Sequence, residues 1–174
     1  ETMIAYEMER YSVQRPVAIT NWVTTDPLTH PNEPYQDTED AVSIDVEHIK
    51  ATASYTAGFF ASYHVYPYYP DFLSYDTDYI DAENPNTYKA YLTQLNAYYS
   101  MPLLITEFGI PTSRGKTHEN AISGFNQGNV EETAQGEMLV SMMADIHDVG
   151  CMGGLIFSWQ DEWFKRTWNT TDQE

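Results

Sequence analysis

The sequence contains little cysteine, little positive charge and no long apolar run. Its one cysteine, Cys151, excludes an intrachain disulfide framework and a zinc site built from several thiolates. Eight Lys and Arg residues stand against 26 Asp and Glu residues, which gives a formal net charge of −18. Such an acidic surface repels the phosphates of nucleic acids and of anionic lipids. The charge therefore predicts no nucleic acid as a partner. No stretch approaches the roughly 20 consecutive apolar residues that span a bilayer, so the sequence also predicts no membrane as a partner.

The length of the chain predicts a single domain over residues 1–174. Of the 174 residues, 42% are hydrophobic, which is enough for one sizeable core. The chain opens at Glu1 rather than at a methionine, and it stops at Glu174 soon after an aromatic segment. We therefore expect a piece of a longer polypeptide.

Short apolar runs, bounded by Pro and Gly, alternate along the chain with segments of helical periodicity. Residues 40–49 fit both a capped helix and an alternating strand, and of the two we favour a short strand. This order of elements is that of an α/β protein with a parallel sheet, in which ligands bind at the carboxyl edge of the strands. The expected elements are strands at 17–20, 59–66, 102–106 and 153–159, helices at 2–11, 87–99 and 130–149, and loops at 24–40 and 110–128.

Glu107 is the sharpest candidate for chemistry. It follows the apolar run at 103–105, and Gly109 then lets the chain turn away. A carboxylate held there is rigid and partly desolvated, as a nucleophile or a general base needs to be, although it could equally pair with an arginine or cap a helix. His64 and Tyr66 lie two residues apart, so on a strand they point to the same side and could reach that carboxylate. A histidine among aromatic residues is also compatible with a structural role in the core.

Aromatic residues follow the last expected strand. Trp159 ends this strand, and Asp161 follows it among further polar and aromatic side chains. Indole faces surrounded by polar groups suit sugar rings, whose C–H faces stack on aromatics while their hydroxyls need hydrogen-bond partners. Packing in the core and at its rim would account for the same aromatic residues.

Four segments of the chain resemble, in order, strands five to eight of the clan A retaining glycoside hydrolases, the (β/α)8 or TIM barrel group that includes β-galactosidases and cellulases. The resemblance implies a partial TIM barrel, roughly its C-terminal half. It implies that Glu107 is the catalytic nucleophile, that His64 and Tyr66 support it, and that Trp159 lies under the sugar ring. We also expect Asn21, Trp22, Asp161 and Arg114 at the substrate. The matching segments are RPVAITNW at 15–22, ASYHVYP at 61–67, PLLITEFG at 102–109 and GGLIFSWQD at 153–161.

Retaining chemistry needs a second carboxylate, about 5–5.5 Å from the first, that acts as an acid and then as a base. In the family it follows an asparagine at the end of strand four, and Asn32-Glu33 spells this pair. Glu33 nevertheless lies far past Thr20, with prolines in between. If residues 17–20 form strand five, the acid belongs to an absent N-terminal part and the isolated chain has little glycosidase activity. If the run at 42–46 is strand five, Glu33 is the acid.

Other interpretations stay open beside the enzyme. A carbohydrate-binding or structural module could keep the cleft of a barrel without turnover. The acidic residues Asp71, Asp76, Asp161 and Glu162 could hold calcium, although the chain has no EF-hand loop. For the enzyme we expect a carbohydrate substrate and neither a cofactor nor a metal, and the sugar, the linkage and hydrolysis or transfer are left open. The compartment is also open, with an extracellular or cell-surface location favoured. Four parallel strands would leave two sheet edges, which we expect a missing N-terminal half or a homo-oligomer to cover.

Overall fold

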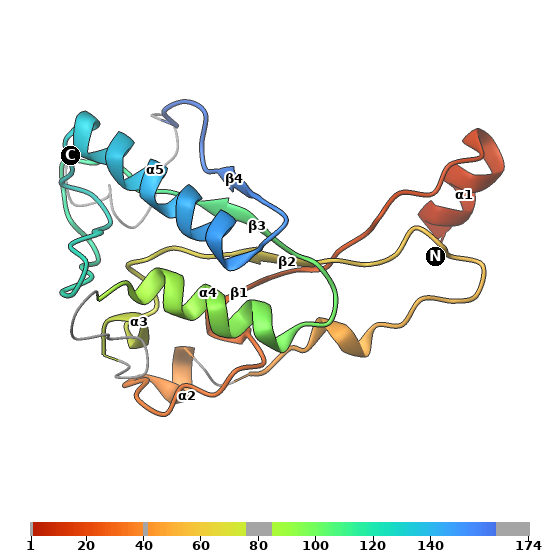
Figure 1. Cartoon of the computed structure of the whole chain (residues 1–174), viewed down its shortest axis with the longest axis horizontal. Helices are drawn as coiled ribbons and strands as arrows, with labels where there is room; N and C mark the ends of the chain where they lie inside the picture. Colours follow the sequence, from red (N-terminus) through yellow and green to blue (C-terminus); the bar gives the residue numbers. More distant parts are fainter. Residues whose placement is uncertain (1, 40–41, 76–84, 163–174) are drawn as a thin grey trace.

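The computed structural model describes residues 2–39, 42–75 and 85–162. Their centre is a sheet of four strands, and all neighbouring strands in it are parallel (Figure 1). The strands lie in the order in which they occur along the chain. This arrangement confirms the predicted α/β class with a parallel sheet. The strands are β1 (Thr20–Trp22), β2 (Ala61–His64), β3 (Leu103–Phe108) and β4 (Gly154–Ile156).

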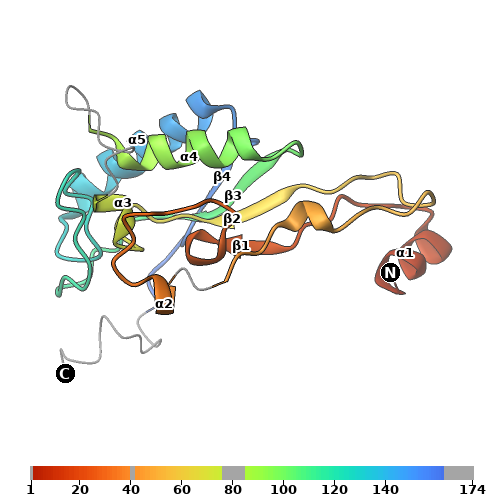
Figure 2. The same cartoon turned by 90° about the horizontal axis from the view of Figure 1, so that it is seen from below.

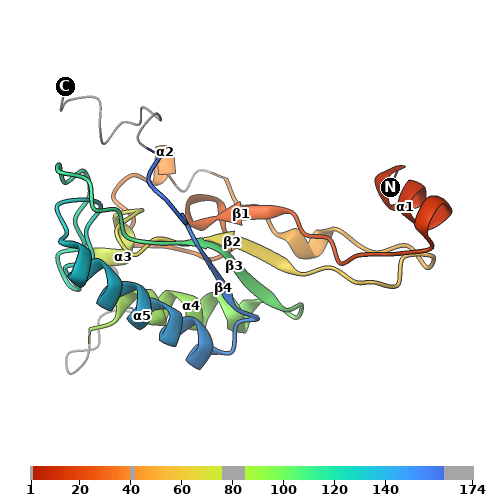
Figure 3. The same cartoon turned by 90° about the horizontal axis from the view of Figure 1, so that it is seen from above.

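Two long helices cover one face of the sheet. Helices α4 (Thr87–Tyr98) and α5 (Glu132–Val149) lie side by side on this face (Figures 1 and 2). Helix α1 (Thr2–Tyr11) lies beyond the N-terminal ends of the strands, far from α5, in every view (Figure 3). No helix in the described ranges is long and apolar enough to cross a membrane. The short helices are η1 (Val23–Thr25), α2 (Gln36–Glu39), η2 (Val46–His48) and α3 (Phe72–Tyr75).

The ends and the apolar faces of the two long helices follow from their sequences. Asn86 caps α4, because its side chain accepts a hydrogen bond from the backbone N–H of Lys89. Gly150 ends α5 with a φ of 87°, a left-handed conformation that favours glycine. The face of α5 that turns toward the sheet is apolar: Met142 and Ile146 are fully buried, and three partly buried residues pack against the core. Those partly buried residues are Met138, Leu139 and Met143.

A glycine lets α5 come close to the sheet. At Gly154 in β4, an added Cβ would lie 2.8 Å from Ile146 Cδ1 of α5 and 2.8 Å from Phe108 Cε1 of β3. Only a residue without a side chain fits between these two groups. Gly154 therefore sets the distance between α5 and the β3–β4 pair.

Two sequence-based expectations at the N-terminal side are wrong. The first strand begins at Thr20, whereas in 17–19 only Val17 forms a bridge, to Phe59, and Ile19 is half-exposed. Residues 42–45 form no strand, and η2 follows them, with the Asp45 carboxylate accepting from the backbone N–H of Glu47. Residues 40 and 41 lie outside the described ranges. Elsewhere the expected long elements are present, with α5 starting two residues later than predicted.

Candidate active site

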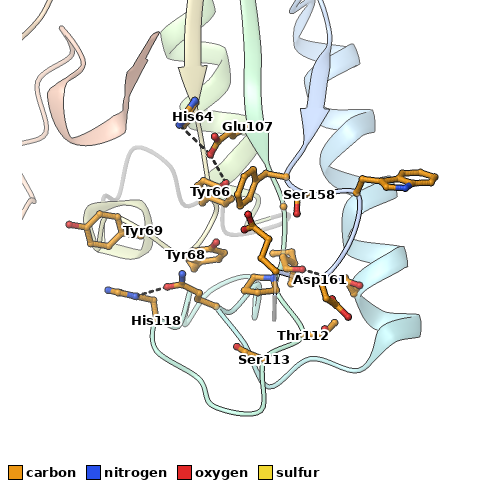
Figure 4. A pocket seen from close by; sticks show the side chains of 18 of the residues that line it. His64, Tyr66, Tyr68, Tyr69, Glu107, Thr112, Ser113, His118, Ser158 and Asp161 are labelled. Atoms are coloured by element: carbon orange, nitrogen blue, oxygen red, sulfur yellow. Dashed lines mark hydrogen bonds and ion pairs between the residues drawn. The ribbon is translucent and has the colours of Figure 1, made fainter. Parts of the chain in front are cut away.

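A cleft of about 1320 Å³ lies at the carboxyl ends of the four strands (Figure 4). Its walls come from the segments that follow β1, β2, β3 and β4 in turn. Parallel strands bring these segments to one edge of the sheet, which is where the sequence analysis expected a ligand to bind. The residues considered below that line it are Trp22, His64, Tyr66, Tyr68, Tyr69, Glu107, Arg114, His118, Trp159 and Asp161.

The Glu107 carboxylate contacts both predicted supporting residues. The Tyr66 hydroxyl donates a hydrogen bond to Glu107 Oε2 at 2.8 Å, and His64 Nδ1 lies 3.2 Å from the same oxygen (Figure 4). The strand register produces this contact: His64 in β2 is aligned with Glu107 in β3, and Val65 donates its backbone N–H to the Glu107 carbonyl. The side chains of Glu107 and His64 are 27% and 35% exposed, so both are open to the cleft.

The phenols beside Glu107 are held in their neutral form. Burial raises the pKa of Tyr66 well above its ordinary value, and the hydrogen bond to Glu107 raises it further. Burial is also the main cause of the raised pKa of Tyr68, to which the charge of Glu107 adds. Tyr66 therefore stays a hydrogen-bond donor over the whole physiological pH range, because its proton is not lost there.

The segment after β4 brings Trp159 and Asp161 to the cleft. Phe157 donates its backbone N–H to the Phe108 carbonyl at 2.9 Å, which holds this segment against β3. The approach is close, because a Cβ at Gly109 would lie 2.5 Å from the Phe157 carbonyl oxygen. Trp159 is 97% exposed and so is available to a ligand. Both predicted positions thus lie in the same cleft as Glu107.

Asn21 does not line the cleft, in contrast to the expectation for it. It is buried, and its side-chain amide donates to the carbonyls of Thr25 and Ile44 and to the Tyr63 hydroxyl. Successive side chains of a strand point to opposite faces, so Trp22 lines the cleft and Asn21 turns away from it. Asn21 therefore fixes the turn after β1 and is not placed to contact a substrate.

Glu33 is also outside the cleft lining. Its side chain is buried in the turn after β1, where one carboxylate oxygen accepts from the backbone N–H of Tyr35 at 2.8 Å. The geometry therefore gives no support to Glu33 as the acid.

A buried polar cluster, which no sequence motif indicated, anchors this turn. His30 Nε2 lies 3.0 Å from both carboxylate oxygens of Asp26, and the Tyr91 hydroxyl of α4 donates to Asp26 Oδ2 at 2.7 Å. The His30 ring stacks on Phe72 at a centroid distance of 3.7 Å. Asp26 and His30 are almost fully buried. Their spacing of four residues suggests a helical pair, and the sequence gives no signal that they meet within a loop.

The loops after β2 and β3 contribute cleft residues that the motifs did not mark. Tyr68 and Tyr69 follow β2, and His118 belongs to the loop that follows β3. The dense Tyr and Pro residues at 66–70 were the available signal for the first of these loops. Arg114, predicted as a substrate contact, is exposed and lines the cleft.

The proposed acidic calcium set finds no support in the described residues. Within residues 2–39, 42–75 and 85–162, no three or more His, Cys, Asp or Glu side chains are grouped so that they could hold a metal ion. Asp76, one of the four acidic residues considered, lies outside these ranges.

No protein-family model matches the chain, and neither a curated protein nor a solved structure matches it significantly. The geometry of the cleft and the motifs in the sequence are therefore the basis for assigning a function.

Proposed function

We propose that this chain is the C-terminal part of a retaining glycoside hydrolase or transglycosylase barrel and that Glu107 is its nucleophile. One observation carries the proposal: Glu107 ends a buried strand, opens into the cleft and holds Tyr66 and His64 on the same carboxylate oxygen. The hydrogen bond from Tyr66 and the contact with His64, both on one oxygen, restrict the orientation in which the carboxylate can attack an anomeric carbon.

The reaction has two steps. The Glu107 carboxylate attacks the anomeric carbon of the sugar, the bond to the leaving oxygen breaks, and a general acid protonates that oxygen. The conjugate base of that acid then takes a proton from water, or from an acceptor sugar in a transfer reaction. The oxygen so activated bonds to the anomeric carbon, and the glycosyl–Glu107 ester bond breaks, which frees the carboxylate. Because Glu33 is buried away from the cleft, we assign the acid to a part of the barrel outside the four described strands.

The shape of the sheet supports a barrel wall. Helices α4 and α5 cover one face, as the outer helices of a barrel do (Figure 2). The edge strand β4 exposes Leu155 and Ile156, each by more than half of its surface. Because successive side chains of a strand point to opposite faces, a closed barrel would bury one of the two in its interior and the other under its outer helices.

A non-catalytic carbohydrate-binding module is the second candidate. The burial of Glu33 favours it, because the acid that the motif predicted is missing from the cleft. The exposed Trp159 would serve a binding module as well as an enzyme.

Covalent trapping separates the two candidates. Fluorosugars with a dinitrophenolate leaving group need little acid assistance, and their glycosyl esters hydrolyse slowly. We expect a panel of such glucosyl, galactosyl and mannosyl reagents to add one glycosyl group to the peptide that contains Glu107, as measured by mass spectrometry. Glu107→Gln should prevent the reaction, whereas the control Glu132→Gln on the exposed start of α5 should not. Saccharide binding without any labelling would favour the binding module.

A further inference from the structure

Three aromatic rings form a continuous wall on the β1 side of the cleft. The rings of Trp22 and Tyr69 have centroids 5.9 Å apart with an interplanar angle of 30°. The His118 ring meets Tyr69 edge-on, with centroids 4.9 Å apart. Trp22 ends β1, Tyr69 belongs to the loop after β2, and His118 belongs to the loop after β3. All three residues line the cleft, and we call them the ring wall.

The ring wall differs from the aromatic core of the protein. Trp22 is 45% exposed, whereas Tyr63 and Tyr91 in the core are fully buried. Tyr69 and His118 are half-buried, so each ring has one part packed and another part at the surface of the cleft. Partly exposed rings in a concave site with polar neighbours are the usual platform for the C–H face of a pyranose.

The ring wall is held in place before any ligand binds. His118 Nδ1 lies 2.9 Å from Gln127 Oε1, and the backbone N–H of Gln127 donates to the His118 carbonyl at 2.8 Å. The Asn120 amide donates to the Pro67 carbonyl at 2.6 Å, which joins the loop after β3 to the loop after β2. A preorganised wall loses little conformational entropy when it binds a ligand.

The ring wall and Trp159 belong to different sides of the site. Trp22 ends the edge strand β1, and Trp159 follows the opposite edge strand β4. Figure 4 shows Tyr69 and His118 on one side of the Glu107 carboxylate and Asp161 on the other. The cleft lining runs from Trp22 at the end of β1 to Trp159 after β4, with Glu107 between them. The cleft therefore has surfaces for sugar units on both sides of the nucleophile.

We infer that the ring wall is a second sugar-binding subsite and that the substrate is an oligosaccharide with units on both sides of Glu107. This inference rests on the proposed function and makes it narrower. A monosaccharide-specific site would need only the platform beside the nucleophile. The ring wall on the β1 side contacts the saccharide only when the saccharide extends past the sugar unit that reacts.

The test measures binding as a function of saccharide length. Linear oligosaccharides from disaccharides to hexasaccharides, on an array that covers plant, fungal and bacterial linkages, are the probe. The saccharide bound best is then titrated by calorimetry against the whole chain as Glu107→Gln, which prevents turnover. We expect the affinity to rise about tenfold between the disaccharide and the tetrasaccharide, since one stacked ring contributes on the order of 1 kcal/mol.

Variants test whether the ring wall causes the rise of affinity with saccharide length. Trp22→Ala should abolish this rise while the disaccharide still binds, and Trp22→Phe should restore part of it. Tyr75→Ala, which removes an exposed tyrosine outside the cleft lining, is the matched control and should leave the rise unchanged. Thermal unfolding of each variant shows that it is folded.

The outcomes are distinguishable. A length-dependent rise that persists in Trp22→Ala, or a native affinity that is the same for all lengths, overturns the second subsite while covalent labelling of Glu107 still supports the proposed function. The absence of any saccharide binding together with the absence of labelling overturns the proposed function and the subsite with it.

Discussion

Tyr66 and His64 both contact Oε2 of Glu107, so the orientation of the carboxylate depends on two side chains from the end of β2. The order and spacing of the motifs predicted this contact, because residues at the ends of neighbouring parallel strands meet at one sheet edge. Which side chain at the end of β1 faces the cleft was harder to predict. Asn21 and Trp22 are adjacent in β1, yet only Trp22 lines the cleft. Successive strand residues point to opposite faces, and the sequence alone does not show which of the two faces the cleft.

Replacement of Tyr66 by phenylalanine should slow the covalent labelling of Glu107. The hydrogen bond holds the carboxylate in its attacking orientation, and a misplacement of about 1 Å can cost on the order of a hundredfold in rate, so we expect a loss of about tenfold to a hundredfold in the labelling rate. The matched control is Tyr98→Phe, which removes a phenol that donates to the Asp45 carboxylate at 3.1 Å, outside the cleft lining. Equal labelling rates for both variants would contradict a positioning role for Tyr66.

Cys151 should react slowly with alkylating reagents. Burial raises the pKa of its thiol to about 11. At pH 8 only about a thousandth of the thiol is then ionised, and the thiolate is the reactive form. We expect iodoacetamide to modify the folded chain more than about tenfold more slowly than the urea-unfolded chain. Equal rates, followed by mass spectrometry, would show that the thiol is freely ionised in the folded protein.

The sequence predicted best those helices whose ends are marked by capping residues close by in the chain. Asn86 and Gly150 fix the start of α4 and the end of α5 by local capping, which depends on a few neighbouring residues. Segment 42–46 has the alternation of a strand, but long-range contacts determine its structure. The Ile44 backbone N–H donates to the Thr25 carbonyl, and its carbonyl accepts from the Asn21 amide. No local pattern reveals such partners.

The packing of α5 on the sheet can be tested at Gly154. In Gly154→Ala the new methyl group meets Ile146 and Phe108 at 2.8 Å, so we expect overpacking to lower the free energy of unfolding by about 1–3 kcal/mol. Gly136→Ala is the control within α5, because a Cβ there meets nothing within 4 Å. It should stabilise the protein by up to about 1 kcal/mol, since glycine disfavours the helix interior. Urea unfolding of both variants measures the two changes, and a destabilised Gly136→Ala would contradict the argument.

Stability should decrease at alkaline pH. Burial raises the pKa of Tyr63, Tyr66 and Tyr88 well above the ordinary value, and it raises the pKa of Tyr99 to about 12. Below about pH 10 these phenols are protonated in both the folded and the unfolded chain, so their full contribution to the free energy of unfolding is present and does not change with pH. Above that value the unfolded chain loses protons that the folded chain retains, so unfolding becomes more favourable. Urea midpoints should be constant between about pH 7 and 9 and fall toward about pH 11. A midpoint that does not fall would contradict the burial of these phenols.

Within the described residues the sheet ends at β1 on one side and at β4 on the other. At the β4 edge, Leu155, Ile156 and Phe157 are exposed apolar residues. We expect this surface to associate, either with the part proposed to complete a barrel or with a second copy, over an area of about 2,000 Å² or more. The net charge of −18 opposes association between copies, but salt screens it within about 8 Å.

Sedimentation equilibrium tests this expectation on the chain by itself. The native chain should show a mass above 20.0 kDa at high protein concentration, and Ile156→Lys should lower the association. The control is Val140→Lys, an exposed apolar residue on α5, away from the sheet edge. A monodisperse monomer of the native chain would show that the open edges need no cover.

The hydrogen bonds of Asn120 have a consequence for evolution and for engineering. Its buried amide donates both to the Pro67 carbonyl and to the Thr87 hydroxyl, so the segments on either side of α3 and the loop that carries His118 are joined at one residue. A chimera that exchanges residues 110–129 alone would lose these hydrogen bonds. Under the proposed function, a change of substrate preference through these loops should therefore require the loops after β2 and β3 to change together.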